Sequence, residues 1–112
     1  MKIAIKGTNL QLTSSIKQYV EEKVGNLDKY LKHVIEAKVE LEKDRHHHTG
    51  DVMRAEVMLV LGSKILRADA SSEDIFASVD LVIPKLKEQI SKFKDKRETL
   101  KRRGARSAKK KF

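Results

Sequence analysis

The chain has 112 residues, 39% of them hydrophobic and 37% charged, which is enough for one hydrophobic core and too short for two ordinary domains. It has no cysteine, which excludes a disulfide framework, a thiolate nucleophile and a zinc site built on thiolates. No apolar run reaches the length of a signal peptide or a membrane-spanning helix, so the chain is predicted to be soluble and cytoplasmic. Its formal net charge is +9.

The first half of the chain predicts two strands with a helix between them. Residues 2–7 alternate apolar and polar side chains, as a half-buried strand does. Thr13 or Ser14 can cap a helix whose apolar residues recur every three or four positions, at Ile16, Val20, Val24, Leu27 and Leu31. From residue 35 the period returns to two, and the inward side chains of this strand are Ile35, Ala37, Val39 and Leu41.

The second half predicts two more strands and a long helix. Residues 55–61 and 66–70 alternate in the same way and are joined by a Gly-Ser turn, which predicts an antiparallel meander. A capping box of Ser71 and Asp74 opens the helix, and Pro84 is expected to kink or restart it. The apolar stripe of this helix consists of Ile75, Val79, Ile83, Leu86, Ile90 and Phe93.

The predicted element order is β-α-β-β-β-α, an α+β fold. The four-stranded sheet has one strongly apolar face, so both helices are expected to pack on that face. The last helix is expected to end at Gly104. This gives a domain of residues 1–103 and a flexible basic tail of residues 104–112.

The positive charge is concentrated near the end of the chain. Residues 1–84 carry 12 Lys or Arg and 13 Asp or Glu, whereas residues 85–112 carry 13 and 3. Such an asymmetry predicts a polyanionic partner, with nucleic acid first and an anionic membrane surface second.

A row of basic residues follows one edge of the last helix. At ~100° per residue, its acidic residues cluster elsewhere and Lys87 and Lys94 fall on the other flank of the apolar stripe. Such lysines usually cover the core with their stems and keep their charges in water. The row nevertheless lacks i,i+4 pairs of opposite charge, which would stabilise the helix by ~0.2 to 0.5 kcal/mol each. Because unpaired positive charges repel one another, this pattern favours a role in binding phosphates. The row consists of Lys85, Lys92, Lys96 and Arg103.

The first helix has an aromatic and basic edge made of Tyr19, Lys23, Asn26 and Tyr30. Tyrosines at the margin of an apolar stripe usually belong to the rim of the core. They can also stack on RNA or hydrogen-bond to it. If both helices share a sheet face, the basic edges of the two helices are predicted to line one groove or ridge.

The sequence contains no motif for catalysis. There is no phosphate-binding loop, no nucleophile elbow and no H-E-x-x-H pair. The triplet His46 to His48 has no regularly spaced partner that completes a tetrahedral set, so a polar loop is favoured over a metal-dependent enzyme or metal sensor. We therefore expect a binding protein with no cofactor, no metal and no small-molecule substrate.

Two segments resemble the family of ribosome hibernation-promoting factors and ribosome-associated inhibitors: "IKGTNLQLTSSIKQYVEEKVGNLDKYL" and "EDIFASVDLVIPKLKEQISKFKDK". The resemblance extends from residue 1 to about residue 97. It implies a fold akin to the double-stranded RNA-binding domain and a stress or stationary-phase factor that binds the small ribosomal subunit at the messenger and transfer RNA channel. Such a factor contacts ribosomal RNA, inhibits translation and stabilises idle ribosomes, dimerised or not.

The resemblance also implies RNA-binding positions. Residues that match commonly basic positions of the family are Lys17, Lys23, Lys29, Lys85, Lys92 and Lys96. Asn26 and Glu88 depart from the family pattern, and Lys87 and Lys94 can compensate. Apart from the resemblance, the aromatic edge of the first helix predicts Tyr30 as a further RNA contact. The chain has no room for the second domain of long members, so we expect a short member or a truncated long one, monomeric off the ribosome. The alternative hypothesis is a general double-stranded RNA-binding module.

Overall fold

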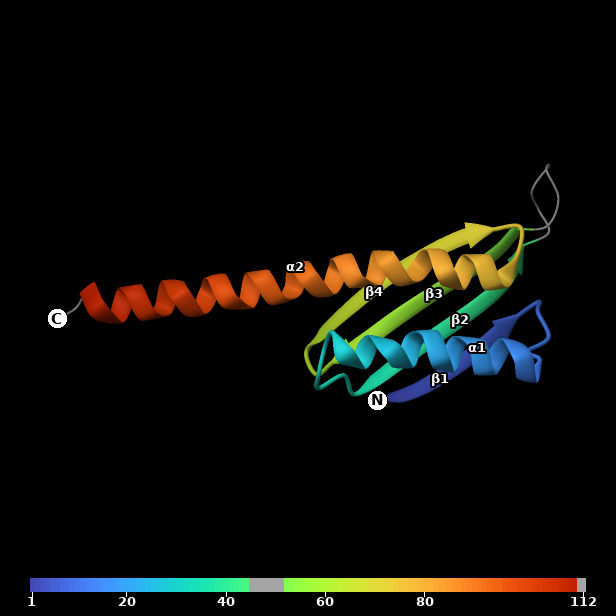
Figure 1. Cartoon of the computed structure of the whole chain (residues 1–112), viewed down its shortest axis with the longest axis horizontal. Helices are drawn as coiled ribbons and strands as arrows, with labels where there is room; N and C mark the ends of the chain where they lie inside the picture. Colours follow the sequence, from blue (N-terminus) through green and yellow to red (C-terminus); the bar gives the residue numbers. More distant parts are fainter. Residues whose placement is uncertain (45–51, 111–112) are drawn as a thin grey trace.

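The computed structural model describes the backbone of residues 1–44 and 52–110, and the side chains of residues 1–44 and 52–96 (Figure 1). The predicted β-α-β-β-β-α order is confirmed, with one added turn of 3-10 helix, η1, after the first helix. The elements are β1 (Lys2–Thr8), α1 (Ser14–Gly25), η1 (Asn26–Lys29), β2 (Glu36–Asp44), β3 (Val52–Leu61), β4 (Lys64–Ser72) and α2 (Ile75–Lys110).

The four strands form one sheet in the order β1-β2-β3-β4. β1 and β2 are parallel because α1 carries the chain back across the sheet between them, whereas β2, β3 and β4 form the predicted antiparallel meander. Gly62 opens the two-residue turn between β3 and β4 with a φ of 66°, a left-handed value that glycine adopts without a steric penalty.

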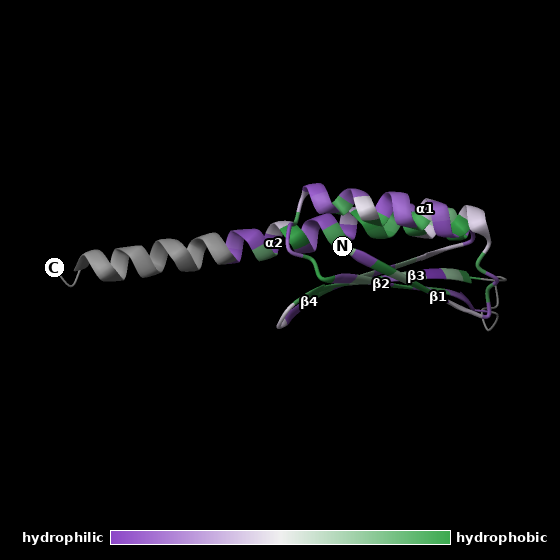
Figure 2. Ribbon diagram, turned by 90° about the horizontal axis from the view of Figure 1, so that it is seen from below, coloured by the Kyte–Doolittle hydropathy of each residue, from purple (hydrophilic) through white to green (hydrophobic). Residues whose placement is uncertain are grey.

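Both helices lie on the same face of the sheet, as predicted, and none of the described elements covers the opposite face (Figure 2). The core fills the space between the helices and the sheet. Of the side chains predicted to point inward, Ile35 is an exception: it precedes β2 at the end of the sheet and is 60% exposed. Val82 is 0% exposed and was missed by the predicted stripe. Residues that form the centre of the core are Val20, Val24, Leu27, Leu41, Leu59, Leu86 and Val82.

Polar side chains lie at the start of both helices, and one of them caps α1. The Thr13 hydroxyl accepts the backbone N–H of Ile16 at 3.2 Å, which confirms the predicted cap of α1. The predicted box of Ser71 and Asp74 is wrong, because β4 continues to Ser72 and keeps Ser71 paired with β3. Ser72 is the residue whose hydroxyl meets both the N–H and the carbonyl of Asp74, at 3.3 and 2.6 Å.

Of the two outcomes predicted at Pro84, a restarted helix is excluded, because Pro84 lies inside one helix of 36 residues (Figure 1). The prediction that the helix ends at Gly104 is wrong, because the helix continues to Lys110. A single glycine costs only about 1 kcal/mol within a helix, too little to end it where good helix formers follow. The flexibility assigned to residues 104–112 stays a prediction.

Ser78 ties α2 to the sheet from within the core. It is 0% exposed, and its hydroxyl lies 2.6 Å from the Met53 carbonyl on β3 and 2.7 Å from the Ser72 hydroxyl. Because Ser78→Ala removes both hydrogen bonds of a buried hydroxyl and leaves the Met53 carbonyl without this donor, we expect it to lower the free energy of unfolding by about 1 to 3 kcal/mol. Urea denaturation measures this loss. Ser91→Ala, at an exposed position of the same helix, is the control, and equal effects would contradict a role for the buried hydroxyl.

Candidate nucleic-acid interface

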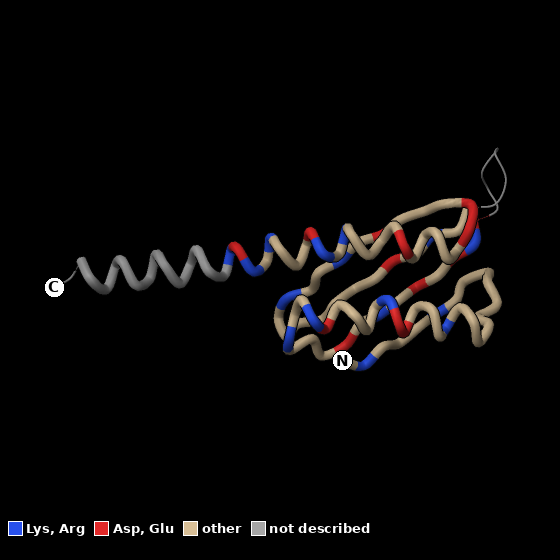
Figure 3. The backbone as a smooth tube through the Cα atoms, in the orientation of Figure 1, with Lys and Arg blue, Asp and Glu red and all other residues tan. Residues whose placement is uncertain are grey.

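The two helices border a groove on the helical face of the molecule. Its volume is about 230 Å³. It lies at the end of the helical layer where α1 leads into η1, and basic positions of η1 and α2 lie there (Figure 3). A groove between the two helices is therefore present, but the α2 lysine that lines it is Lys87 and not Lys85, Lys92 or Lys96 of the predicted basic row. Its lining residues are Lys23, Asn26, Leu27, Lys29, Tyr30, Ile83 and Lys87.

Two lysines of the groove are held over tyrosine rings. The Lys23 Nζ atom lies 5.5 Å from the centre of the Tyr19 ring, and the Lys87 Nζ atom lies 4.8 Å from the centre of the Tyr30 ring. At exposed sites such contacts are worth about 0.5 to 1 kcal/mol. They place the ammonium groups at the groove without neutralising their charge, so both remain available to an anion.

Tyr19 also fixes the two helices against each other. Its ring meets that of Phe76 edge to face, with centroids 5.1 Å apart and an interplanar angle of 79°. Its hydroxyl donates a hydrogen bond to Asp80 Oδ1 on α2. This hydrogen bond, followed by partial burial and the negative charge of the same carboxylate, raises the pKa of Tyr19 to about 12.

The contact between Tyr19 and Asp80 predicts a pH dependence. Because the fold favours the neutral hydroxyl, the stabilisation is present below the ordinary tyrosine pKa of about 10 and is lost as the pH rises through about 12. In a Tyr30→Phe variant Tyr19 is the single tyrosine, and its near-ultraviolet absorbance should titrate near 12. Adding Asp80→Asn should lower the midpoint toward the ordinary value, and an unchanged midpoint would contradict this account.

The row on the other flank of α2 is not free of partners. Lys92 forms an i,i+4 ion pair with Glu88 at 3.1 Å, so the prediction that the row forgoes such pairs is wrong. Lys85 donates a hydrogen bond to the backbone carbonyl of Asp69 on β4 at 2.9 Å. This contact directs Lys85 toward the sheet edge and away from α1. The structure therefore separates Lys85 and Lys92 from the groove lysines.

The remaining predicted positions have different places. Lys17, Lys94 and Lys96 are exposed on the helices and lie outside the groove lining. Arg103 belongs to α2, but its side chain lies outside the described residues, as does the whole triplet His46 to His48. Within the described part of the chain, no three His, Cys, Asp or Glu side chains are grouped so that they can hold a metal ion.

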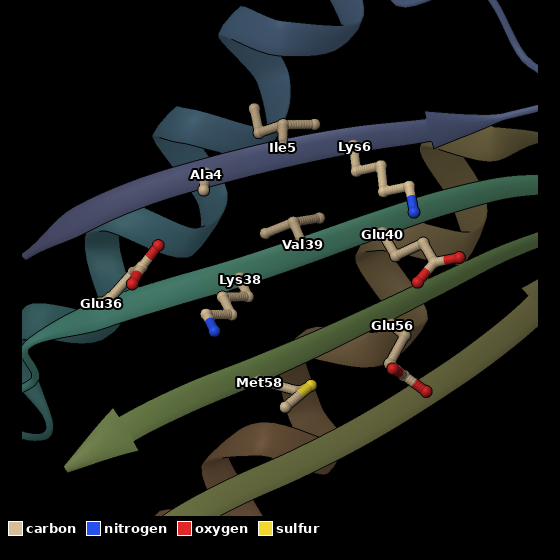
Figure 4. Close-up of a pocket in the computed structure, with 9 residues that line it drawn as sticks. All are labelled: Ala4, Ile5, Lys6, Glu36, Lys38, Val39, Glu40, Glu56 and Met58. Atoms are coloured by element: carbon tan, nitrogen blue, oxygen red, sulfur yellow. The ribbon is translucent and has the colours of Figure 1, made fainter. Parts of the chain in front are cut away.

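The opposite face of the sheet has a different chemistry. A hollow of about 280 Å³ lies over β1, β2 and β3, and Figure 4 shows Lys6 and Lys38 beside Glu36, Glu40 and Glu56. Next to it, Arg54 pairs with Glu56 at 2.8 Å and Asp69 at 3.2 Å. Because acids and bases are mixed here, the described residues of this face offer a polyanion no region of uniform positive charge.

The comparison with known protein families settles what kind of chain this is. Residues 3–98 match the family model described as sigma 54 modulation protein / S30EA ribosomal protein. The chain belongs to this family. The resemblance predicted from the sequence is thereby confirmed, and the S30EA match extends from β1 through α1 and the other three strands to residue 98 within α2.

Two curated relatives are named ribosome hibernation promotion factor. The one from Lactococcus lactis subsp. cremoris is 38% identical over 96 residues, covering 84% of this chain and 50% of the relative. The one from Staphylococcus aureus is 32% identical over 94 residues, covering 84% of this chain and 48% of the relative. The chain therefore spans about half the length of these curated S30EA-type relatives.

Solved structures share the S30EA fold. The N-terminal domain of Thermus thermophilus Protein Y has a TM-score of 0.71 and 31% identity, over 83% of this chain and 99% of that one. A ribosomal subunit interface protein from Coxiella burnetii has a TM-score of 0.75 at 20% identity, over 85% of this chain and 99% of that one, which shows likeness of fold alone. Among the described residues, no helix is both long and apolar enough to cross a membrane.

Proposed function

We propose that this S30EA family member is a ribosome hibernation factor that binds the small ribosomal subunit, contacts its RNA across the messenger and transfer RNA channel, and keeps idle ribosomes inactive. It acts as a binding protein and not as an enzyme, in the cytoplasm where ribosomes work, and is a monomer off the ribosome. The observation that carries this proposal is the lysine-lined groove between α1, η1 and α2, on the helical face of a chain that matches the family from residue 3 to 98.

The groove supplies the first group of RNA contacts. Lys23, Lys29 and Lys87 converge on one hollow, where three positive charges side by side repel each other until phosphates neutralise them. Tyr30 adds an exposed ring at the same place. These residues come from three different elements, so only the folded chain presents them together.

The outer flank of α2 supplies a second group of contacts. Lys85, Lys92 and Lys96 follow one edge of the helix, from which Lys85 reaches Asp69 on β4, and each is exposed. We assign them to the phosphates of neighbouring RNA, together with Arg103, Lys94 and, on α1, Lys17. An RNA surface that touches both flanks must span the width of α2, which suits a folded ribosomal RNA better than one free strand.

Glu88 is expected to weaken the outer contact. Its ion pair with Lys92 joins two side chains that are 66% and 69% exposed, so it adds about 0.5 kcal/mol at most to stability. Glu88→Gln frees Lys92 for a phosphate and should make the negative slope of log affinity against log salt steeper by just under one. Glu36→Gln on the sheet face, with the same change of charge, should leave the slope unchanged. Equal slopes for wild type, Glu88→Gln and Glu36→Gln would mean that Lys92 does not contact a phosphate.

The proposal is tested by sedimentation with purified ribosomes through a sucrose gradient at moderate salt. We expect the chain to move into the ribosome fractions and to bind free duplex RNA only weakly. A chain that stays at the top of the gradient while binding duplex RNA tightly would instead be a general double-stranded RNA-binding module.

A further inference from the structure

The groove contains more than a phosphate site requires. Its lining includes Leu27, which is 2% exposed, and the partly buried Ile83, so the hollow has apolar walls. Asn26 adds a side-chain amide with both donors and an acceptor. A surface that only held phosphates would need neither the apolar walls nor the amide.

Tyr30 is the aromatic member of this lining, and 44% of it is exposed. The Lys87 ammonium lies 4.8 Å from the ring centre and is itself on an exposed, flexible side chain. A flat ligand can displace this ammonium from the ring. Lys87 would then lie beside the ligand, where its charge can meet a phosphate.

The size of the hollow restricts the ligand. A volume of about 230 Å³ is below the ~300 to 1,000 Å³ of pockets that enclose a drug-sized molecule. It has room for one flat ring system with a charged group at its rim. Paired bases do not fit this description, because their faces are already stacked and their edges already bonded inside the duplex.

We propose that the groove binds one unpaired nucleotide of RNA. The base stacks on Tyr30, its edge bonds to the Asn26 amide, and its phosphate meets Lys23, Lys29 or Lys87. This inference rests on the proposed function in so far as it takes RNA as the ligand. It adds that the RNA presents a splayed base here, whereas the outer flank of α2 meets phosphates only.

The test compares two probes on the full chain: a single-stranded RNA of ~8 nucleotides and the duplex of the same sequence. Tyr30→Leu keeps an apolar side chain at an exposed position, and its far-ultraviolet circular dichroism and urea midpoint check that the fold is intact. We expect it to weaken single-strand binding by about 5- to 100-fold and to leave duplex binding unchanged. In NMR spectra of the wild-type chain, the resonances of the Tyr30 ring and the Asn26 amide should shift when the single strand is added and not when inorganic phosphate is added.

An equal loss on both probes, or no loss on either, would overturn the proposal. Sedimentation of the same two proteins with ribosomes separates this outcome from a failure of the proposed function. Wild type that binds ribosomes while Tyr30→Leu leaves single-strand binding intact refutes the nucleotide site alone. Wild type that binds the single strand through Tyr30 but no ribosomes refutes the proposed function alone.

Discussion

Replacing Lys23 and Lys87 together by glutamate should abolish ribosome binding under conditions where the wild-type chain binds fully. The two ammonium groups border one groove from α1 and α2, so the reversal sets two carboxylates against the phosphates at a single place. Like charges in contact cost several kcal/mol, which corresponds to roughly 100-fold or more in Kd. Cosedimentation with ribosomes over a range of protein concentrations measures the change.

The matched control is Lys6→Glu with Lys38→Glu, which makes the same change of net charge on the sheet face opposite the helices. Both residues are exposed and line the hollow on that face. This pair should bind ribosomes almost as wild type does. If both double variants lost binding equally, bulk charge and not the groove would carry the interaction.

Lys85→Glu with Lys92→Glu should give an intermediate loss of binding. Lys92 already forms an ion pair with Glu88, and Lys85 donates a hydrogen bond to the Asp69 carbonyl. The outer flank therefore offers less free positive charge than its spacing in the sequence indicates.

Leu86→Ala should cause the largest loss of stability among single substitutions in α2. Leu86 is 0% exposed and lies where the helix packs on the sheet. Truncation to alanine removes apolar contacts and leaves a cavity, at a cost of about 2 to 5 kcal/mol out of the ~5 to 15 kcal/mol that stabilise a typical domain. Urea denaturation followed by circular dichroism measures the loss.

Leu81→Ala is the control for this change, because Leu81 lies on the same helix and is 50% exposed. Its cost should stay below about 1 kcal/mol, since little apolar surface returns to water. A similar midpoint for the two variants would mean that α2 is not anchored to the sheet through Leu86.

Most of the fold was predictable because its signals are periodic and local. The alternation at Val39 and Leu41 predicts which face of one strand is buried, and the helical spacing of Val20 and Val24 predicts which face of one helix is buried. All four residues are buried in the structure. The errors arose where tertiary structure overrides a local signal. Ser71 is a good cap by sequence, but pairing with Arg54 extends β4 through it.

The candidate site was predictable only in part. A helical wheel places Lys85 and Lys87 on opposite flanks but does not say which flank faces the other helix. The choice of Lys85 as a principal residue and Lys87 as a secondary one missed that Lys87 lines the groove. The pair of Glu88 and Lys92 was visible as an i,i+4 spacing, whereas the bond from Lys85 to the Asp69 carbonyl depends on β4 and is invisible in the sequence.

The central claim, that the helical face occupies the RNA channel of the small subunit, is tested most directly by competition. Purified small subunits are sedimented with the chain, first empty and then with messenger and transfer RNA bound. We expect stoichiometric binding to empty subunits and loss of binding as transfer RNA fills its sites. Binding that is unaffected by transfer RNA, or that is equally strong on large subunits, would contradict the claim.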